Sequence, residues 1–266
     1  VISIADSAFA YQFIESLSLP NTLVTIGSSA FRGSQIPSLV IPDSVTSIGR
    51  YAFKDVWTLT DLTIGSSVTI IGQQAFASSG LTSLNIPDNV TTLDSYAFAN
   101  TPLETLNIGS GLSSVYRNVF DKTCSTLRSI SINSPSSLSK DNSYNVSVDW
   151  RESSFTAYNG LHFSDTACSN LETLTFGDNI TSIGDSVFTG LQSDIYFLGS
   201  KPTIHSNAFT NSSSEMSIRY CPNTTGWSDN LISGVTPQID ASCDSDLDGI
   251  INTADSFPFD SKENID

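Results

Sequence analysis

Apolar residues recur along this chain at a spacing of about 22 positions. The clearest marker is a phenylalanine that usually follows an alanine, and the intervals between its first six occurrences are 22, 22, 23, 22 and 22 residues. The occurrences are Phe9, Phe31, Phe53, Phe76, Phe98, Phe120, Phe188 and Phe209. A fixed period of this length is typical of solenoid proteins, in which each repeat forms one coil. We therefore expect these rings to stack as a column in the core.

Two apolar segments accompany each phenylalanine. The segment before it has the form aliphatic-Ser/Thr-x-aliphatic, as in residues 45–48, and the segment after it has the form Leu-x-x-Leu-x-Ile, as in residues 81–86. Apolar residues at alternate positions predict a half-buried strand. Because a Gly or Pro-Asp corner follows, we interpret the recurring Asp43, Asp88 and Asp178 as turn residues. Stacked coils would then pair their strands in parallel and bury their apolar faces on one another.

Residues 36–53 contain nearly the whole consensus Leu-x-x-Leu-x-Ile-Pro-x-Ser-Val-Thr-Ser-Ile-Gly-x-x-Ala-Phe. This pattern resembles the BspA-like leucine-rich repeats of surface proteins, and the resemblance covers roughly residues 1–227. It includes the ending Thr-Thr-Gly-Trp at 224–227, after a final strand at 216–220. The resemblance implies a mostly β, leucine-rich-repeat solenoid at a cell surface, often adhesive. Such a solenoid has one parallel strand per coil, short second strands and helical turns.

Three stretches depart from this repeat. Residues 133–160 lose the pattern, and we interpret them as an irregular insertion within the solenoid of residues 1–227. Residues 228–243 are expected to be a capping segment or linker, and residues 244–266 a truncated, acidic calcium-binding repeat. The chain opens in mid-repeat and stops where another acidic repeat would begin, so we expect a fragment with coils or a cap upstream.

The charge balance narrows the classes of partner. The chain has 27 acidic and 11 basic residues, for a net charge of −16. Such a charge repels nucleic acids and anionic membranes, and no apolar run approaches the roughly 20 residues needed to cross a bilayer. We therefore expect a monomer that neither binds nucleic acid nor inserts into a membrane. The two histidines, His162 and His205, belong to no recognisable catalytic motif, so we expect no enzymatic activity.

Four cysteines in an acidic chain rich in Ser and Thr favour an oxidising, extracellular compartment. Cys221 ends the last predicted strand and Cys243 precedes the acidic tail, so we predict a disulfide between them. Cys124 and Cys168 occupy the same position of their repeats. If residues 128–170 form one enlarged coil, these two cysteines lie on adjacent coils and can bond. If two coils intervene, they lie too far apart and remain buried thiols.

The acidic residues of the C-terminal stretch follow the spacing of a calcium loop. Oxygen-bearing residues stand at the ligand positions, and Gly249 stands where the sharp turn requires a glycine. The predicted ligands are Asp244, Asp246, Asp248, the carbonyl of Ile250, Asn252 and Asp255. The residues that follow resemble thrombospondin type 3 repeats, which implies a second ion at Asp260, Glu263 and Asp266. We expect a structural Ca²⁺ that makes the tail compact, and the alternative is a solvated acidic linker.

Polar residues alternate with the core residues of the predicted strands, so they would form one exposed face. The candidate ligand-binding residues on this face are Asp61, Thr63, Ser83, Asn85, Thr105 and Asn107. The insertion is a second candidate contact, through Tyr144, Trp150, Arg151 and Tyr158, because aromatic and arginine side chains often anchor interfaces. Since solenoids present extended faces to partners, we predict a secreted or cell-surface recognition or adhesion module that binds proteins or glycans.

Two alternatives remain for this face. It is an ordinary solvated sheet if the solenoid is a passive spacer within a larger surface protein. More remotely, a regular ladder of hydroxyl groups would suit ice or another crystal surface. The ladder consists of Thr46, Thr69, Thr91, Ser113 and Thr181.

Overall fold

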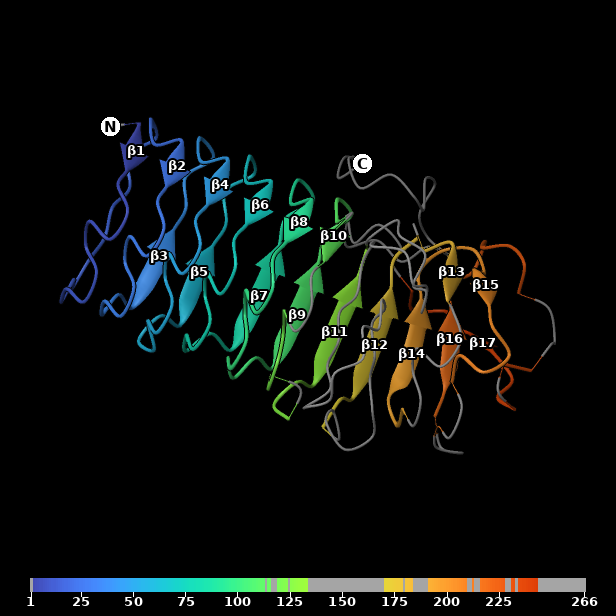
Figure 1. The fold of residues 1–266 in the computed structure, drawn as a ribbon. Coiled ribbons are helices and arrows are strands. Elements are labelled where there is room, and N and C mark those ends of the chain that lie inside the picture. Colours follow the sequence, from blue (N-terminus) through green and yellow to red (C-terminus); the bar gives the residue numbers. More distant parts are fainter. Residues whose placement is uncertain are drawn as a thin grey trace.

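The computed structural model describes residues 2–112, 114–115, 119–123, 125–133, 170–178, 180–183, 191–209, 212, 216–227, 231–232 and 234–243. These residues wind into a solenoid of stacked coils that runs from β1 to β17 (Figure 1). Each regular coil has three sides: a longer strand, a short strand and a turn. All the strand pairs are parallel, which confirms the expected solenoid.

The longer strands form one row along the solenoid. In most of them the outward positions are polar and the inward positions apolar, as the alternation in the sequence predicts, whereas Val40 and Ile239 are exposed apolar residues. One two-stranded sheet and one seven-stranded sheet make up the row. The first consists of β3 (Ser38–Val40) and β5 (Asp61–Thr63); the second consists of β7 (Ser83–Ile86), β9 (Thr105–Ile108), β11 (Ser129–Ile132), β12 (Thr173–Phe176), β14 (Asp194–Phe197), β16 (Ile218–Tyr220) and β17 (Gln238–Ile239).

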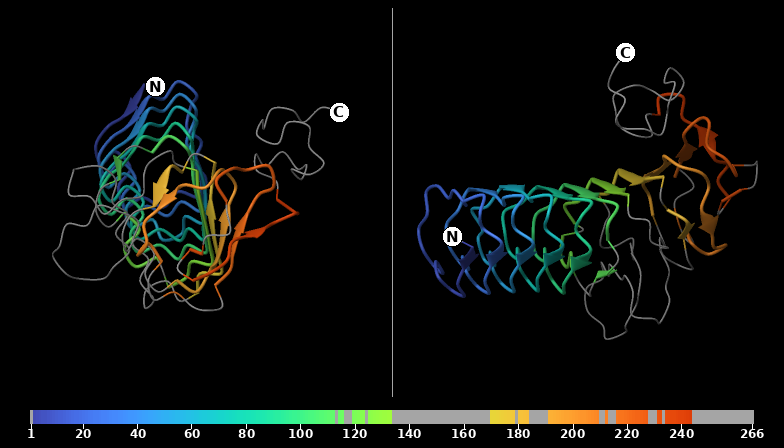
Figure 2. Two further views of the ribbon diagram at one scale, coloured as in Figure 1. Left: turned by 90° about the vertical axis from the view of Figure 1, so that its right-hand side faces the viewer. Right: turned by 90° about the horizontal axis from the view of Figure 1, so that it is seen from above.

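The short strands form a second row on another side of the coils (Figure 2). They follow the Pro-Asp or Gly corner and precede the phenylalanine, as expected of the short second strands. The row consists of β1 (Ser3–Ile4), β2 (Thr25–Ile26), β4 (Ser47–Ile48), β6 (Ile70–Ile71), β8 (Thr92–Leu93) and β10 (Ser114–Val115), followed by the pair β13 (Ser182–Ile183) and β15 (Thr203–Ile204).

The third side of the regular coils is a six-residue turn, at 6–11, 28–33, 50–55, 73–78 and 95–100. Helical turns were expected here, but the described residues contain no helix. In each turn the second and the sixth residue have positive φ, as at Tyr51 (59°) and Asp55 (61°). Left-handed residues interrupt a right-handed helix, which is why the turns do not wind into one. We call these segments together the turn side.

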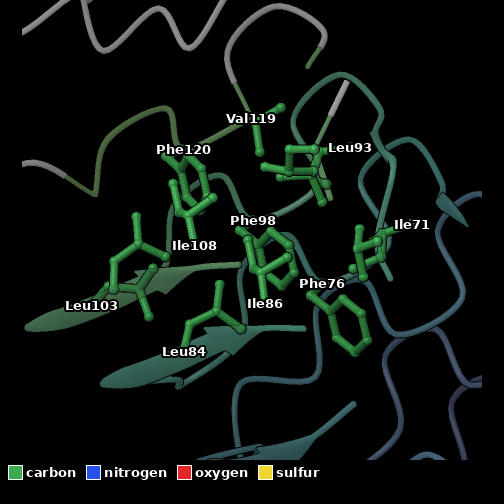
Figure 3. Packing of buried hydrophobic residues seen from close by; sticks show 14 of the residues in the cluster. Ile71, Phe76, Leu84, Ile86, Leu93, Phe98, Leu103, Ile108, Val119 and Phe120 are labelled. Atoms are coloured by element: carbon green, nitrogen blue, oxygen red, sulfur yellow. The ribbon is translucent and has the colours of Figure 1, made fainter. Parts of the chain in front are cut away.

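The phenylalanine of each turn points inward and forms the predicted column (Figure 3). Successive ring centroids from Phe9 to Phe120 lie 5.1 to 5.8 Å apart, with interplanar angles of 4° to 12°. The small alanine beside each ring lets neighbouring coils approach, because its carbonyl accepts a hydrogen bond from the phenylalanine N–H of the preceding coil. For Phe53 and Ala75 this bond is 2.8 Å long. The rings of Phe31 to Phe120 are almost fully buried, whereas Phe9, on the first coil, is 45% exposed.

At the Pro-Asp corners, aspartate side chains connect consecutive coils. Asp43 Oδ1 accepts hydrogen bonds from the backbone N–H of Ser66 (2.7 Å) and from its hydroxyl (3.0 Å). Asp88 Oδ1 accepts from the N–H of Ser110 in the same way, at 2.6 Å. Each carboxylate therefore satisfies a backbone donor of the next coil, which supports its interpretation as a turn residue.

The solenoid sheet continues beyond the strand that we expected to be the last. β17 pairs with β16 in parallel, with Tyr220 opposite Ile239, and the N–H of Asp240 donates to the carbonyl of Tyr220. The sequence around β17 lacks the leucine pattern, so periodicity did not reveal this strand. The expected disulfide between Cys221 and Cys243 is present, with the Cα atoms 5.3 Å apart, and it connects the segments that follow β16 and β17.

Strand β11 pairs directly with β12, with Ser129 opposite Thr173. This pairing favours the alternative in which residues 128–170 form one enlarged coil, with Cys124 and Cys168 on adjacent coils. One residue beyond Cys124, the carbonyl of Ser125 accepts a hydrogen bond of 2.6 Å from the Asn170 side chain. The two cysteines lie outside the described residues, so their disulfide stays a prediction.

Candidate ligand-binding face

The structure brings together the six candidate residues that sequence analysis placed on one face. All six are exposed, and they lie on the outer side of the neighbouring strands β5, β7 and β9. Between β7 and β9 the register is direct, because Ser83 lies opposite Thr105 and Asn85 opposite Asn107. The Thr105 hydroxyl donates to the Ser83 hydroxyl at 2.9 Å. The Asp61 carboxylate accepts a hydrogen bond of 2.8 Å from the Thr60 hydroxyl.

This face continues with short serine and threonine side chains over β11 and β12, and with larger or charged side chains over β14 and β16. Tyr196 on β14 lies opposite Arg219 on β16, and the Arg219 guanidinium carbon is 5.7 Å from the Tyr196 ring centroid. Asp194 accepts a hydrogen bond of 2.7 Å from the Ser217 hydroxyl. Sequence reasoning missed these residues because the spacing from Leu191 to the strand is one residue longer than in the other repeats. The alternation of Ile195 and Phe197 was the available signal.

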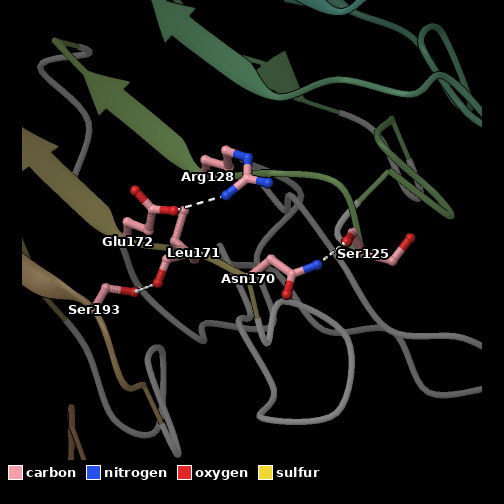
Figure 4. A network of polar contacts seen from close by, with 6 residues as sticks. All are labelled: Ser125, Arg128, Asn170, Leu171, Glu172 and Ser193. Atoms are coloured by element: carbon pink, nitrogen blue, oxygen red, sulfur yellow. Dashed lines mark hydrogen bonds and ion pairs between the residues drawn. The ribbon is translucent and has the colours of Figure 1, made fainter.

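Polar contacts also connect the coils at the entrance to β12 (Figure 4). The Arg128 Nη1 and Glu172 Oε1 atoms form an exposed ion pair at 2.8 Å. On the next coil the Ser193 hydroxyl, which is buried, donates to the carbonyl of Leu171 at 2.9 Å. Because the two long side chains of the ion pair are solvated, this pair contributes little to stability and instead places opposite charges beside the sheet.

The first three members of the hydroxyl ladder lie on the short-strand side, and their hydroxyl groups connect neighbouring coils. The side-chain hydroxyl of Thr69 donates to the carbonyl of Thr46 at 3.2 Å, and that of Thr91 donates to the carbonyl of Thr69 at 3.1 Å. The Thr46 hydroxyl donates to the carbonyl of Val24 at 3.4 Å. These donors are directed at the main chain of the preceding coil rather than at an external lattice. Ser113 lies outside the described residues.

Two groups of predicted site residues lie outside the described residues. They are the insertion residues Tyr144, Trp150, Arg151 and Tyr158, and all the predicted calcium ligands from Asp244 to Asp266. Within the part of the chain that the structure describes, no three His, Cys, Asp or Glu residues gather closely enough to hold a metal ion. The same part contains no helix of the length and hydropathy that a membrane span requires.

One corner carboxylate has a perturbed acidity. Two hydrogen bonds from Ser66, the stronger from its backbone N–H and the other from its hydroxyl, lower the pKa of Asp43. Because these donors favour the charged form, the carboxylate is suited to connecting coils. A general acid or base would require a pKa that approaches neutrality, which is the opposite shift.

The family follows from a comparison of the sequence with protein-family profiles. The BspA type leucine rich repeat region matches in six copies, over residues 2–128, 122–215 and 161–241. The chain belongs to this family. The match extends past residue 227 to the segment that contains β17, in agreement with the additional strand. A comparison with curated protein sequences gives no significant match.

Three solved structures are similar to this BspA-type chain. A leucine-rich repeat protein of T. pallidum, TpLRR, is 18% identical, with a TM-score of 0.50 over 70% of this chain and 79% of that chain. A leucine-rich repeat protein from Bacteroides ovatus is 19% identical, with a TM-score of 0.42 over 83% and 70% of the two chains. A leucine rich cell surface protein from Faecalibacterium prausnitzii is 18% identical, with a TM-score of 0.30 over 88% and 89%. The likeness to TpLRR supports the leucine-rich-repeat solenoid fold.

Proposed function

We propose that this BspA-type solenoid is a non-catalytic recognition or adhesion module that binds protein or glycan partners through the outer face of its longer strands. The observation that carries the proposal is the row of exposed, short polar side chains on the neighbouring strands β5, β7 and β9, which is in direct register between β7 and β9. Apolar residues at the alternate positions hold the strands in the core, so the outward positions are free to vary with the partner. Repeat proteins commonly use such extended faces for binding.

A secreted or cell-surface location fits this role. The disulfide between Cys221 and Cys243 requires an oxidising compartment to form and persist. The net charge of −16 keeps the chain soluble and suits a partner that is neutral or basic on the side that meets this face. We propose that the module acts as a monomer.

We further propose that Asp244, Asp246, Asp248, Ile250, Asn252 and Asp255 bind one Ca²⁺, and that Asp260, Glu263 and Asp266 contribute to a second. The first ligand directly follows Cys243, which the disulfide holds against the end of the sheet. A calcium-bound tail would therefore begin at a fixed point of the solenoid. Ca²⁺ should raise the melting temperature and produce heat in calorimetric titration; no heat and an unchanged melting curve would favour the solvated linker.

The binding face can be tested with a paired set of variants on a glycan array and a panel of immobilised extracellular proteins. Asn85→Arg together with Asn107→Arg adds bulk and charge at the centre of the proposed face without touching the core. Ile70→Arg adds the same side chain on the short-strand side, at a residue that is 45% exposed. We expect the parent chain and Ile70→Arg to share ligands that the double variant loses. Absence of any ligand, or equal loss in both variants, would favour the passive spacer.

A further inference from the structure

Three cationic side chains converge on one tyrosine ring on the turn side. The guanidinium carbons of Arg50 and Arg32 lie 4.3 and 5.7 Å from the ring centroid of Tyr51, and Lys54 Nζ lies 5.5 Å from it. Arg50 also donates a hydrogen bond to the Tyr51 hydroxyl. Asp55 forms an ion pair of 3.5 Å with Arg32 Nε. We call these five residues the Tyr51 cluster.

The charge of the Tyr51 cluster contrasts with that of its surroundings. Three cations and one carboxylate give it a net charge of +2, in a chain whose net charge is −16. Arg32, Arg50 and Lys54 are also the only Lys or Arg residues among the first 116 positions, which contain eight acidic residues. All the positive side chains of these 116 residues therefore lie around one ring. Mutual repulsion among like charges makes such convergence unfavourable in the absence of an anion.

The neighbouring coils show that folding does not require these cations. At the positions equivalent to Arg32 and Lys54, the other turns carry Ala10, Ala77 and Ala99. At the position of Arg50 they carry Asp6, Ser28, Gln73 and Ser95, none of which is basic. The backbone contacts are nevertheless alike, because the phenylalanine N–H bonds to the next alanine carbonyl at 2.8 Å in four successive turns. The three basic residues are departures from a repeat that folds without them.

The geometry of the Tyr51 cluster suits an anionic group approached from solvent. Arg50 is exposed, while Arg32, Tyr51 and Lys54 are half-buried, so their positions are restrained and their charged ends remain accessible. The Nε of Arg32 is shielded from water and makes no hydrogen bond beyond its long contact with Asp55. Guanidinium groups pair with carboxylate and sulfate in two-pronged geometry, and lysine adds a point charge. Tyr11, 68% exposed on the adjacent coil, widens this surface with a second ring.

We propose that the Tyr51 cluster binds the carboxylate or sulfate groups of an acidic polysaccharide. The net charge of the whole chain disfavours nucleic acids and anionic bilayers, whose closely spaced charges would meet the acidic remainder of the surface. A polysaccharide with widely spaced anionic groups can place one or two of them at the cluster. The cluster is on the turn side, so this interaction is separate from the partner proposed for the strand face.

The test uses a triple variant made from residues that the repeat itself carries: Arg32→Ala, Arg50→Gln and Lys54→Ala. Lys201→Ala is the control. It removes one cation, at a half-buried lysine far along the chain, and so shows the effect of losing a single charge outside the Tyr51 cluster. Binding to immobilised hyaluronate, which has one carboxylate per disaccharide, κ-carrageenan, which has one sulfate per disaccharide, neutral dextran and poly-glutamate is measured by biolayer interferometry. A chelator is present throughout, so that calcium cannot bridge a polyanion to the acidic tail. Circular dichroism verifies that the variants fold.

We expect the parent chain to bind hyaluronate or κ-carrageenan but not dextran, and binding to weaken as ionic strength rises. The triple variant should bind about tenfold more weakly, because several exposed charge pairs each contribute modestly, whereas Lys201→Ala should bind like the parent. The strand-face variant Asn85→Arg with Asn107→Arg should also retain this binding. Equal binding by parent and triple variant, or no binding to either polysaccharide, would overturn the proposal. Preference for poly-glutamate would assign the cluster to an acidic protein segment instead.

Discussion

The coils before and after the enlarged coil are held together in different ways. From Phe9 to Phe120, nearly parallel rings stack at each step, and the same backbone contacts recur. Towards the C-terminal end, the rings of Phe176 and Phe197 still stack at 4.9 Å, but with a wider interplanar angle of 24°. Further contacts are added there: Phe197 lies 4.9 Å from Trp227 at an interplanar angle of 53°, and Trp227 stacks on Tyr220 at 4.8 Å. The first region is stabilised by repetition, and the second by individual contacts that cover the end of the sheet.

The difference shows what a coil gains from its neighbours. Phe9, with a neighbouring ring on one side only among the described residues, is 45% exposed, whereas Phe31 is 1% exposed. At the other end, Cys221 is fully buried, and the Trp227 indole donates a hydrogen bond to the carbonyl of Gly199 at 3.3 Å. In a solenoid each coil contacts only the adjacent ones, so effects of substitution should remain local. Three predictions test this comparison.

The largest effect is expected for Phe76→Ala in the middle of the column. Phe76 is completely buried, and its ring centroid lies 5.2 Å from that of Phe53 and 5.3 Å from that of Phe98. Its loss should lower the free energy of unfolding by about 3–5 kcal/mol, because a large cavity remains. Phe9→Ala should cost less than half as much, since part of that ring is already solvated. Urea denaturation of both variants measures the difference, and equal losses would mean that the column is not the main support.

A smaller and more local effect is expected when Cys221 and Cys243 are both replaced by serine. The disulfide spans a separation of 22 residues. A loop of that length corresponds to about 3 kcal/mol of stabilisation in the chain-entropy description. Hydrogen–deuterium exchange should show faster exchange at β16 and β17, with β3 to β9 unchanged. Uniform loss of protection along the chain would contradict the nearest-neighbour picture.

The smallest effect concerns the corner carboxylate of Asp43. Its pKa in the folded chain is lowered by the Ser66 donors, so its stabilising contribution is present above the usual aspartate pKa and disappears as the pH falls through the lowered value. Asp43→Asn should therefore be slightly less stable than the parent at neutral pH, and this difference should vanish in acid. Ser66→Ala should have a weaker effect, because the backbone N–H remains. If the difference in stability between Asp43→Asn and the parent grew in acid, the pKa of Asp43 would be raised by folding and not lowered.

Several parts of the fold could be predicted because they follow from local alternation. The pattern at residues 81–86 places Leu84 inward and Asn85 outward, and the structure agrees. The recurring Ala-Phe pair predicts the column, since identical side chains at a fixed interval stack when coils stack. Strand β17 and the outer residues of β14 were missed because their sequences lack the leucine spacing. Backbone pairing with the preceding coil, rather than local pattern, determines their place.

The amino-acid sequence alone was sufficient to determine the period of the solenoid, the inward and outward positions of its strands and the pairing of Cys221 with Cys243. Only the tertiary structure showed that Arg32, Arg50 and Lys54 surround Tyr51, because their approach depends on a six-residue turn with left-handed residues at two fixed places. Hydrophobic periodicity reports which side chains are buried. It contains no information about the direction of a charged side chain on an irregular turn, which is decided by backbone dihedral angles and by the adjoining coil.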